Sequence, residues 1–239
     1  MAAENRYSRQ LLISQLGEAG QEKLARSCVT VVGCGGLGSP VLTYLTLAGV
    51  GHIRLVDCDT VSETNLNRQF LYREQDIDQS KSRQAALFLK ERNSKIRLEP
   101  IEAVLTEENA EQILQGSDVV VDCVDRISVR RLVGHACQKL EISLIEGGIH
   151  GFYGYVLPVQ PGKSACLECL ETNRAKENLP VPALGAVAGL IGSIQAVECM
   201  KVLLNLDGVH FGTLLQYDGI YGEFEEIPVK IRPDCSCQK

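Results

Sequence analysis

The sequence predicts an α/β fold with a mostly parallel sheet, helices on both faces, and antiparallel strands added at its C-terminal end. Short apolar runs alternate with helical patterns between residues 28 and 150. After Gly147-Gly148 the pattern changes to one strand-like run, a long helix and two final strand-like runs. Strands separated by helices imply right-handed crossovers and parallel pairing, which is the basis for the first half of the prediction.

The first half is predicted to contain two short helical segments before the first strand, at Arg6–Gln10 and Gln21–Arg26. The elements that follow are recognised by apolar periodicity and by polar caps. The expected strands are Val29–Val32, Ile53–Val56, Ile96–Ile101, Val119–Val121 and Ser143–Glu146. The expected helices are Ser39–Ala48, Lys81–Arg92, a helix capped by Thr106 that runs through Leu114, and Val129–Leu140.

The second half is predicted to begin with a strand at Tyr153–Val159 and to end with two antiparallel strands, Leu214–Tyr217 and Phe224–Val229. A long helix is expected at Gly189–Leu204. The polar stretch at 171–182 has no apolar periodicity, which favours a mobile surface crossover. We therefore expect one domain over 1–239, with N-terminal helices at 1–27, a nucleotide-binding half at 28–150 and a second half at 151–239.

Composition sets limits on function. The chain has 239 residues, of which 45% are hydrophobic and 23% charged, as expected for an ordinary packed core. A net charge of −6 argues against a nucleic-acid binder that works by bulk electrostatics. No apolar stretch is expected to approach transmembrane length, and the first residues lack the apolar core of a signal peptide. These features predict a cytoplasmic protein without a membrane partner.

The most informative local pattern is the glycine-rich turn Gly33-Cys34-Gly35-Gly36-Leu37-Gly38, which stands between a strand and a helix. This pattern predicts a Rossmann-like nucleotide site, in which backbone N–H groups at a helix N-terminus hold a phosphate. On its own the turn leaves nicotinamide, flavin and other nucleotides as alternatives, and tight turns need glycine in any protein.

A second polar cluster follows the next strand and favours triphosphate chemistry. Asp57 and Asp59 close that strand, and Asn65, Arg68 and Gln69 follow within one short loop. A hydride-transfer site needs one acid for the ribose and no cationic loop. Arg68, together with Lys81 at the next helix start, is expected to face the phosphates beside Gly36, although solvated surface charge is the alternative reading of each cation.

Two further acids, Asp122 and Asp125, come directly after a buried strand. Ligands of open α/β sheets bind at this edge, and two carboxylates there can hold Mg²⁺ against triphosphate oxygens. Asp122 could instead cap the helix that follows.

Taken together, these motifs resemble the HesA/MoeB/ThiF family, the prokaryotic relatives of the ubiquitin-activating enzyme. The resemblance covers nearly the whole chain, and the order and spacing of the motifs carry it. It implies ATP- and Mg²⁺-dependent adenylation of the C-terminal glycine of a small ubiquitin-like sulfur carrier that ends in Gly-Gly, in molybdopterin or thiamine biosynthesis. The half at 151–239 would then bind the carrier.

The resemblance also implies roles for single residues. Arg9, Arg68, Lys81 and Asp125 would be catalytic, and Asp125 would hold the magnesium ion. Arg9 would reach across a two-fold axis into the partner's site, so a homodimer is expected. The nucleotide-binding set would be Gly33, Gly35, Gly36, Leu37, Gly38, Asp57, Asp59, Asn65, Arg68, Gln69, Lys81, Asp125 and Arg126.

Ten cysteines occur in the chain, and two groups of four invite opposite interpretations. Cys28, Cys123, Cys137 and Cys199 fall in apolar strands or helices, where a reduced cysteine acts as a small hydrophobe. Four others resemble the family's structural zinc site, and four thiolates are a usual ligand set for Zn²⁺. They are Cys166, Cys169, Cys235 and Cys237, and the last pair has one intervening residue where the family usually has two.

Some relatives carry a cysteine before the long helix that forms a covalent bond with the carrier. Residues 171–188 contain none here, so we expect the chemistry to stop at the acyl-adenylate. The four histidines form no recognisable catalytic pair. Two alternatives remain, adenylation of a peptide C-terminus and an NAD-dependent oxidoreductase. An added peptide-binding domain would favour the first, and this chain has no room for one. The sequence does not identify the carrier.

Overall fold

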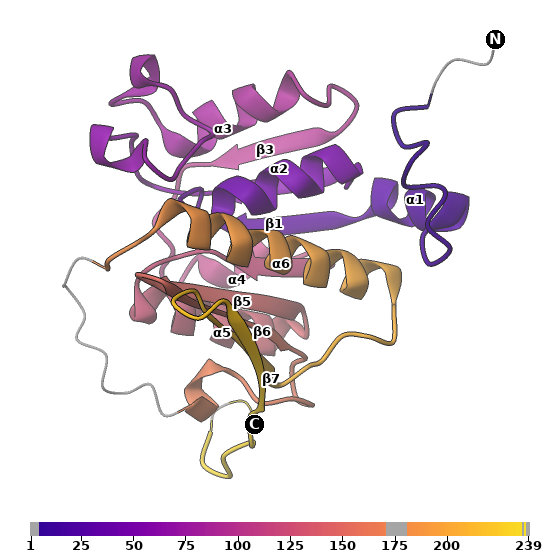
Figure 1. Cartoon of the computed structure of the whole chain (residues 1–239), viewed down its shortest axis with the longest axis vertical. Helices are drawn as coiled ribbons and strands as arrows, with labels where there is room; N and C mark the ends of the chain where they lie inside the picture. Colours follow the sequence, from indigo (N-terminus) through magenta and orange to yellow (C-terminus); the bar gives the residue numbers. More distant parts are fainter. Residues whose placement is uncertain (1–4, 171–180, 236, 238–239) are drawn as a thin grey trace.

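A computed structural model describes residues 5–170, 181–235 and 237 of the chain. Its centre is one eight-stranded sheet with the order β3-β2-β1-β4-β5-β6-β7-β8 (Figure 1). The first five strands of this order pair in parallel, and the pairs from β5 onward are antiparallel. The strands are β1 Cys28–Val32, β2 His52–Val56, β3 Arg97–Ile101, β4 Val119–Asp122, β5 Ser143–His150, β6 Tyr153–Val159, β7 Thr213–Asp218 and β8 Glu223–Pro228.

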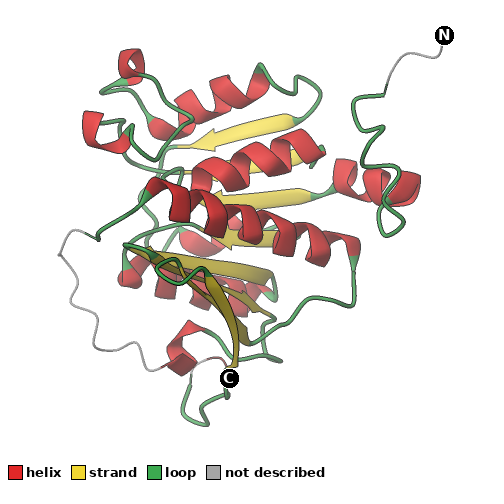
Figure 2. Cartoon of the chain, in the orientation of Figure 1, coloured by secondary structure: helices red, strands yellow, loops and turns green. Residues whose placement is uncertain are grey.

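Helices cover both faces of the sheet, as Figure 2 shows. The helices α2, α3 and α6 share a core with Val29 and Val31 of β1, whereas α4 and α5 share a second core with Val32. The α-helices are α1 Gly17–Arg26, α2 Gly38–Ala48, α3 Lys81–Lys90, α4 Ala110–Leu114, α5 Ile127–Leu140 and α6 Gly185–Leu204. This arrangement confirms the predicted fold class, including the antiparallel strands at the C-terminal end.

The strand predicted to end at Glu146 is the main difference in the sheet. β5 continues through Gly147 and Gly148 to His150 because these residues pair with β6 in antiparallel register. Leu157 lies opposite Glu146, and Tyr155 lies opposite Gly148. The two glycines were read as the end of a strand, but a Cβ at Gly147 would lie 2.4 Å from the Gln195 side chain. They are there because side chains from α6 and β6 approach the strand closely.

Other predictions about local structure were wrong. Arg6–Gln10 forms hydrogen-bonded turns instead of a helix. Thr106 does not cap α4, because Asn109 precedes that helix and its side chain accepts a hydrogen bond from the Thr106 backbone N–H. Helix α6 begins at Gly185, one turn earlier than predicted. Most of the expected crossover at 171–182 lies outside the described residues.

The expectation that no apolar stretch approaches spanning length was also wrong. Helix α6 has 20 residues and is apolar enough, by length and composition, to cross a membrane. In the structure it packs across one face of the sheet, next to α2 (Figure 1). Ala188, Ile191 and Cys199 of this helix are buried, so the helix belongs to the core of the fold.

Candidate functional site

The glycine turn after β1 is closed by contacts that leave little room for side chains. Gly33 has φ = +97°, and a Cβ there would lie 2.8 Å from the backbone oxygen of Cys123. A Cβ at Gly38 would lie 2.0 Å from the oxygen of Gly33. Cys34 is held on both sides, because its N–H donates to Asp57 Oδ2 at 2.7 Å and its carbonyl accepts from Tyr72 Oη at 2.7 Å. These contacts fix the turn at the start of α2.

A cleft of 1160 Å³ opens above this turn, at the carboxyl ends of the parallel strands. In Figure 1 these ends lie on the left, where α2 and α6 begin. Binding sites of open α/β sheets occupy this position. The structure brings eleven of the thirteen nucleotide-binding residues predicted above to the lining of the cleft: Gly33, Gly35, Gly36, Leu37, Asp57, Asp59, Arg68, Gln69, Lys81, Asp125 and Arg126.

The two acids after β2 have different partners. Asp57 accepts hydrogen bonds from the backbone N–H groups of Cys34 and Asp59, the latter at 2.9 Å. Burial raises the pKa of its carboxyl, and these hydrogen bonds oppose the rise. Asp59 forms an ion pair with Lys81 at 3.1 Å. Lys81 is 7% exposed, so its charge is directed into the cleft and not to bulk solvent.

The loop between β2 and α3 places Arg68 at the mouth of the cleft. Its Nη1 donates to the carbonyl of Thr64 at 2.8 Å and to Asn67 Oδ1 at 3.0 Å. Gln69 is 4% exposed, and its Oε1 has no hydrogen-bond partner among the described residues. Asn65 is not part of the cleft lining, because its side chain accepts from the Ser62 N–H within a short 3-10 helix, Glu63–Asn65.

Gly38 is the other predicted residue outside the lining, because it is buried under the turn. Asp125 is exposed and lines the cleft. Asp122 is fully buried and does not face a ligand, because it pairs with Arg130 at 3.3 Å and accepts a hydrogen bond from the Val124 N–H. It does not cap α5, whose N-cap is Arg126. Of the two acids, only Asp125 is placed to reach a cation in the cleft.

Sequence reasoning missed Arg130, which lines the cleft, and Gln195, which is buried and binds the end of β4. Arg130 Nη1 donates to the Gly147 carbonyl at 2.6 Å, and Nη2 donates to the Val124 carbonyl. Gln195 Nε2 donates to the carbonyl of Asp122 at 2.8 Å. Both side chains tie β4 to neighbouring elements. The signal in the sequence for Arg130 was its position eight residues after Asp122, with the start of α5 between them.

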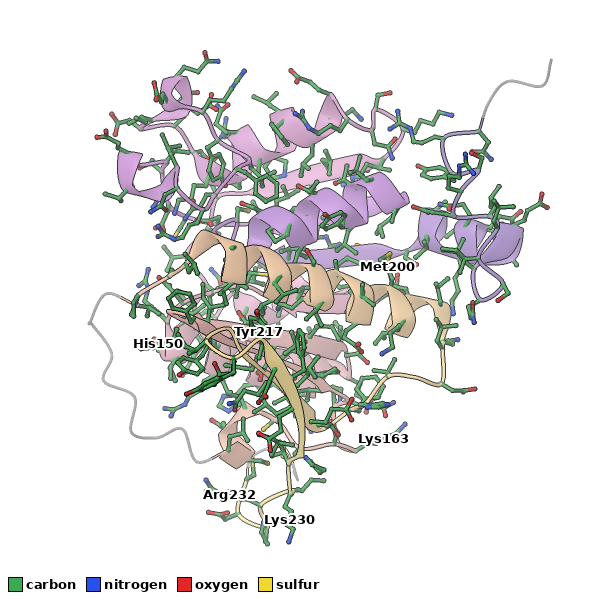
Figure 3. The ribbon with its side chains drawn as sticks, viewed as in Figure 1. His150, Lys163, Met200, Tyr217, Lys230 and Arg232 are labelled. Carbon is green, nitrogen blue, oxygen red and sulfur yellow. The ribbon has the colours of Figure 1, made fainter. Side chains whose placement is uncertain are left out.

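The cleft continues past the glycine turn along the antiparallel strands. This second part is lined by Gly148, Ile149, His150, Tyr153, Gly154, Tyr155, Leu167, Val181, Ala183, Leu214 and Gln216. Figure 3 shows His150 and Tyr217 on the sheet below α6. The cleft thus joins a polar, charged part to an extended part made largely of strand backbone and apolar side chains.

Arg9 lies away from the cleft of its own chain. The N-terminal segment, indigo in Figure 1, lies beside α1 at the opposite end of the parallel strands. Gln10 donates to the carbonyl of Ala48 at the end of α2, and Tyr7 Oη accepts from Asn93. These contacts anchor the segment at the amino ends of the strands.

The four late cysteines form a compact group. Cys166 Sγ and Cys235 Sγ are 3.6 Å apart, as are Cys169 Sγ and Cys237 Sγ, and all four sulfur atoms lie within 4.8 Å of one another. Zn–S bonds of about 2.3 Å in a tetrahedron place sulfur atoms about 3.8 Å apart. The donor set and its spacing therefore fit a tetrahedral metal ion, and the one-residue spacer between Cys235 and Cys237 does not prevent this.

The remaining cysteines near the cleft are poor nucleophiles. Cys34 and Cys199 are fully buried, and burial raises the pKa of both thiols. Cys58 is exposed, but partial burial and then the charges of Asp59 and Asp57 raise its pKa. The expectation that Cys199 is packed inside its helix is confirmed.

Comparisons with known proteins agree with this geometry. The profile of the ThiF family matches residues 7–239. The SAMP-activating enzyme E1 of Haloferax volcanii is 37% identical over 236 residues, which cover 97% of this chain and 87% of that protein. The adenylyltransferase and sulfurtransferase MOCS3 of Mus musculus is 39% identical over 240 residues, which cover 96% of this chain and 51% of that protein.

This chain thus spans about half the length of the MOCS3 proteins that it matches. Among solved structures, E. coli MccB with ATP superposes with a TM-score of 0.86 at 24% identity, over 100% of this chain and 75% of that one.

Proposed function

The chain belongs to the ThiF family, and we propose that it is an ATP-dependent adenylyltransferase acting on the C-terminal glycine of a ubiquitin-like sulfur carrier. The observation that carries this proposal is the composite cleft. A phosphate-sized turn, Lys81 and Arg68 occupy one part, and a strand-lined extension occupies the other. A carrier tail is extended and ends in a carboxylate, so both parts are needed to bring it to the α-phosphate.

The reaction would proceed by attack of the tail carboxylate on the α-phosphorus of ATP. A P–O bond to the carboxylate forms, the bond to the β-phosphate bridge breaks, and pyrophosphate leaves. Two anions must approach each other, so preorganised cations lower the barrier. Lys81 is suited to this because its ammonium is already desolvated beside Asp59.

Arg68 would neutralise the departing pyrophosphate, and backbone amides at Gly35 and Gly36 would hold the phosphates. Asp57 would hold the ribose, with Asp59, Gln69 and Arg126 completing the nucleotide contacts, and Asn65 would act through the shape of its loop. When bound, Mg²⁺ would supply further charge neutralisation, and Asp125 offers the exposed carboxylate that could hold it.

Arg9 belongs to a segment at the end of the parallel strands opposite its own cleft. This position supports a role for Arg9 in a partner's site, and therefore a homodimer.

The cysteine group would hold a structural Zn²⁺ that joins the turn after β6 to the C-terminal residues. Metal analysis of purified protein tests the zinc proposal. Less than about half an equivalent of zinc, with all four thiols free, would contradict it. We expect the enzyme to act in the cytoplasm.

The direct test is exchange of labelled pyrophosphate into ATP. Purified enzyme should catalyse exchange with a ubiquitin-like protein ending in Gly-Gly and with Mg²⁺. The same carrier without its last glycine should support none, because the attacking carboxylate would stop short of the α-phosphate. Exchange with an unrelated peptide carboxylate at an equal rate would favour the peptide alternative. Reduction of NAD⁺ by a substrate, without exchange, would favour the oxidoreductase alternative.

A further inference from the structure

A second cluster of reactive side chains lies at the end of the sheet opposite the cleft. It consists of Cys28 and His52, the first residues of β1 and β2, and Glu99 at the middle of β3. Cys28 is in register with His52, and Arg54 with Glu99. β1 has five residues that rise about 3.3 Å each, so the cluster lies about 16 Å from the glycine turn. The strand ends concerned lie near α1 (Figure 1).

The three side chains form a chain of contacts. Cys28 Sγ lies 3.3 Å from His52 Nδ1, and His52 Nε2 lies 2.8 Å from Glu99 Oε2. An ionised carboxylate only accepts hydrogen bonds, so Nε2 must carry the hydrogen. The neutral ring then presents the lone pair of Nδ1 to the thiol. Catalytic cysteines are activated by this arrangement, in which a base lies beside the nucleophile and a third group orients the base. Cys28, His52 and Glu99 would have these three roles in order.

The surroundings leave this cluster accessible. Parallel strands covered on both faces are usually apolar on both, but the face of these strands that carries Cys28 is polar over its first rows. Helix α4, on this face, has only five residues, and Arg54 donates to the carbonyl of Gln115 beyond its end. Cys28 is half-buried, and the side chains of His52 and Glu99 are 19% and 36% exposed.

The charges around the thiol make a base necessary. Burial raises the pKa of the Cys28 thiol most, Arg54 lowers it, and Asp118 and Glu99 add to the rise. Arg97 lowers it slightly and donates to Glu99 at 2.9 Å, so that carboxylate has a counter-charge. At neutral pH the thiol therefore keeps its proton until a base takes it. Asp118 is held elsewhere, because its Oδ2 accepts from the Cys28 backbone N–H at 2.7 Å.

From this geometry we propose that Cys28 is a reactive thiol that undergoes exchange with low-molecular-weight disulfides. His52 acts as its base, and Glu99 is the positioning residue that orients His52. The sulfur of Cys28 attacks one sulfur of the disulfide, and its proton passes to His52 Nδ1. A new S–S bond forms to Cys28, the S–S bond of the reagent breaks, and a thiolate leaves. Cys28 and the retained half share the oxidised state, and the leaving half is reduced. The site is separate from the proposed adenylation cleft.

The test compares Cys28 with Cys58 in the same molecule. Protein is treated with a substoichiometric amount of 5,5′-dithiobis(2-nitrobenzoate) near neutral pH, and the labelled cysteines are identified by peptide mass mapping. Exposure alone predicts that Cys58 reacts first, because Cys58 is exposed and Cys28 is half-buried. The proposal predicts that Cys28 is labelled at least about ten times faster. Faster labelling of Cys58 would overturn it.

Two variants distinguish activation from access. His52→Asn removes the base, and Glu99→Gln removes the group that orients it. Each should slow labelling of Cys28 about tenfold or more at neutral pH, while the Cys58 rate in the same sample reports that the fold is intact. At alkaline pH hydroxide replaces the base, so the variants should approach the parent rate. A structural defect would not show this convergence.

The matched control is His210→Asn, because His210 pairs with Glu226 at 3.5 Å in a different part of the molecule. It should leave the Cys28 rate unchanged. Equal Cys28 rates in the parent and in His52→Asn would show that the imidazole plays no part and would overturn the proposal.

Discussion

Asp122 and Arg130 form an ion pair at 3.3 Å under the cleft, and their side chains are 0% and 7% exposed. Each has further partners, because Asp122 accepts from the Val124 N–H and Arg130 donates to the Gly147 carbonyl. The pair therefore fixes the end of β4 relative to β5. Asp125, which is proposed to hold the metal ion, lies three residues after Asp122. Its position therefore depends on the Asp122–Arg130 pair, although that pair is not proposed to contact the ligand.

Arg130→Met is expected to be strongly destabilising, because it leaves the Asp122 carboxylate buried without its counter-charge. We expect a loss of about 3–5 kcal/mol in the free energy of unfolding. Chemical denaturation measures this. Arg26→Met is the control, since the Arg26–Glu22 pair is 82% and 70% exposed. A similar, small loss in both variants would show that Arg130 is not structurally important.

Arg68→Ala and Asp125→Ala should each lower the rate of pyrophosphate exchange about a hundredfold or more. Each change removes a charge that faces the reacting phosphates in the proposed complex. Both positions are on the cleft surface, so thermal unfolding should be almost unchanged. Exchange at the parent rate in both variants would remove these residues from the proposed machinery.

Mixing Arg9→Ala with Lys81→Ala subunits should restore part of the activity lost in each alone. In a mixed dimer one of the two sites combines an intact Arg9 with an intact Lys81, provided Arg9 acts across the interface. Exchange activity is measured after mixing and subunit equilibration. A parent enzyme that is fully active as a monomer would refute the arrangement, as would an Arg9→Ala variant with full activity.

Incubation of enzyme, carrier and ATP should give no adduct that reductant removes on a non-reducing gel. Residues 171–188 contain no cysteine, Cys199 is fully buried, and Cys58 lies between two carboxylates. Buried thiols and thiols next to anions are slow to form thiolates. A stable adduct that disappears in Cys199→Ser would show that helix α6 opens during the reaction.

Glu146→Gln should make the protein less sensitive to alkaline pH. The side chain of Glu146 is 1% exposed, its Oε2 has no partner among the described residues, and burial together with Asp122 raises its pKa to about 8. Because the folded pKa exceeds the unfolded value, the folded state holds the extra proton. Stability is then present at low pH and is lost as pH rises towards the folded pKa.

The difference between Glu146→Gln and the parent should therefore grow between about pH 5 and pH 8, reaching roughly 4 kcal/mol in favour of the variant. Denaturation at several pH values, with bound metal held constant, measures it. A pH-independent difference would mean that Glu146 does not titrate in this range.

Sequence reasoning predicted the fold because the evidence for it is local. Glycines at Gly33 and Gly38, alternating elements and the two acids after β2 are all readable within a few residues. The same reasoning placed eleven nucleotide-binding candidates that the structure gathers in one cleft. Their roles in nucleotide binding stay predictions.

What sequence reasoning missed depends on residues that are distant in the chain. Cys28 was read as a strand hydrophobe, yet its partner His52 is 24 residues away and Glu99 is 47 residues beyond that. The histidines were assigned nothing for the same reason. Gly147 was read as the end of a strand because no local pattern reveals that the Gln195 side chain packs against it. Only the sheet register and the packing of α6 bring these groups together.

The single sheet also bears on whether the two halves of the chain can be separated. β5 belongs to both, since it pairs in parallel with β4 and, over seven residues, in antiparallel fashion with β6. A fragment ending at His150 would leave that whole edge unpaired, and an exposed strand edge recruits other chains. It would also lack α6, whose Gln195 binds the carbonyls of Asp122 and Ile145. Residues 28–150 are therefore not an autonomous folding unit, because β6 completes the pairing of their last strand and α6 completes their packing.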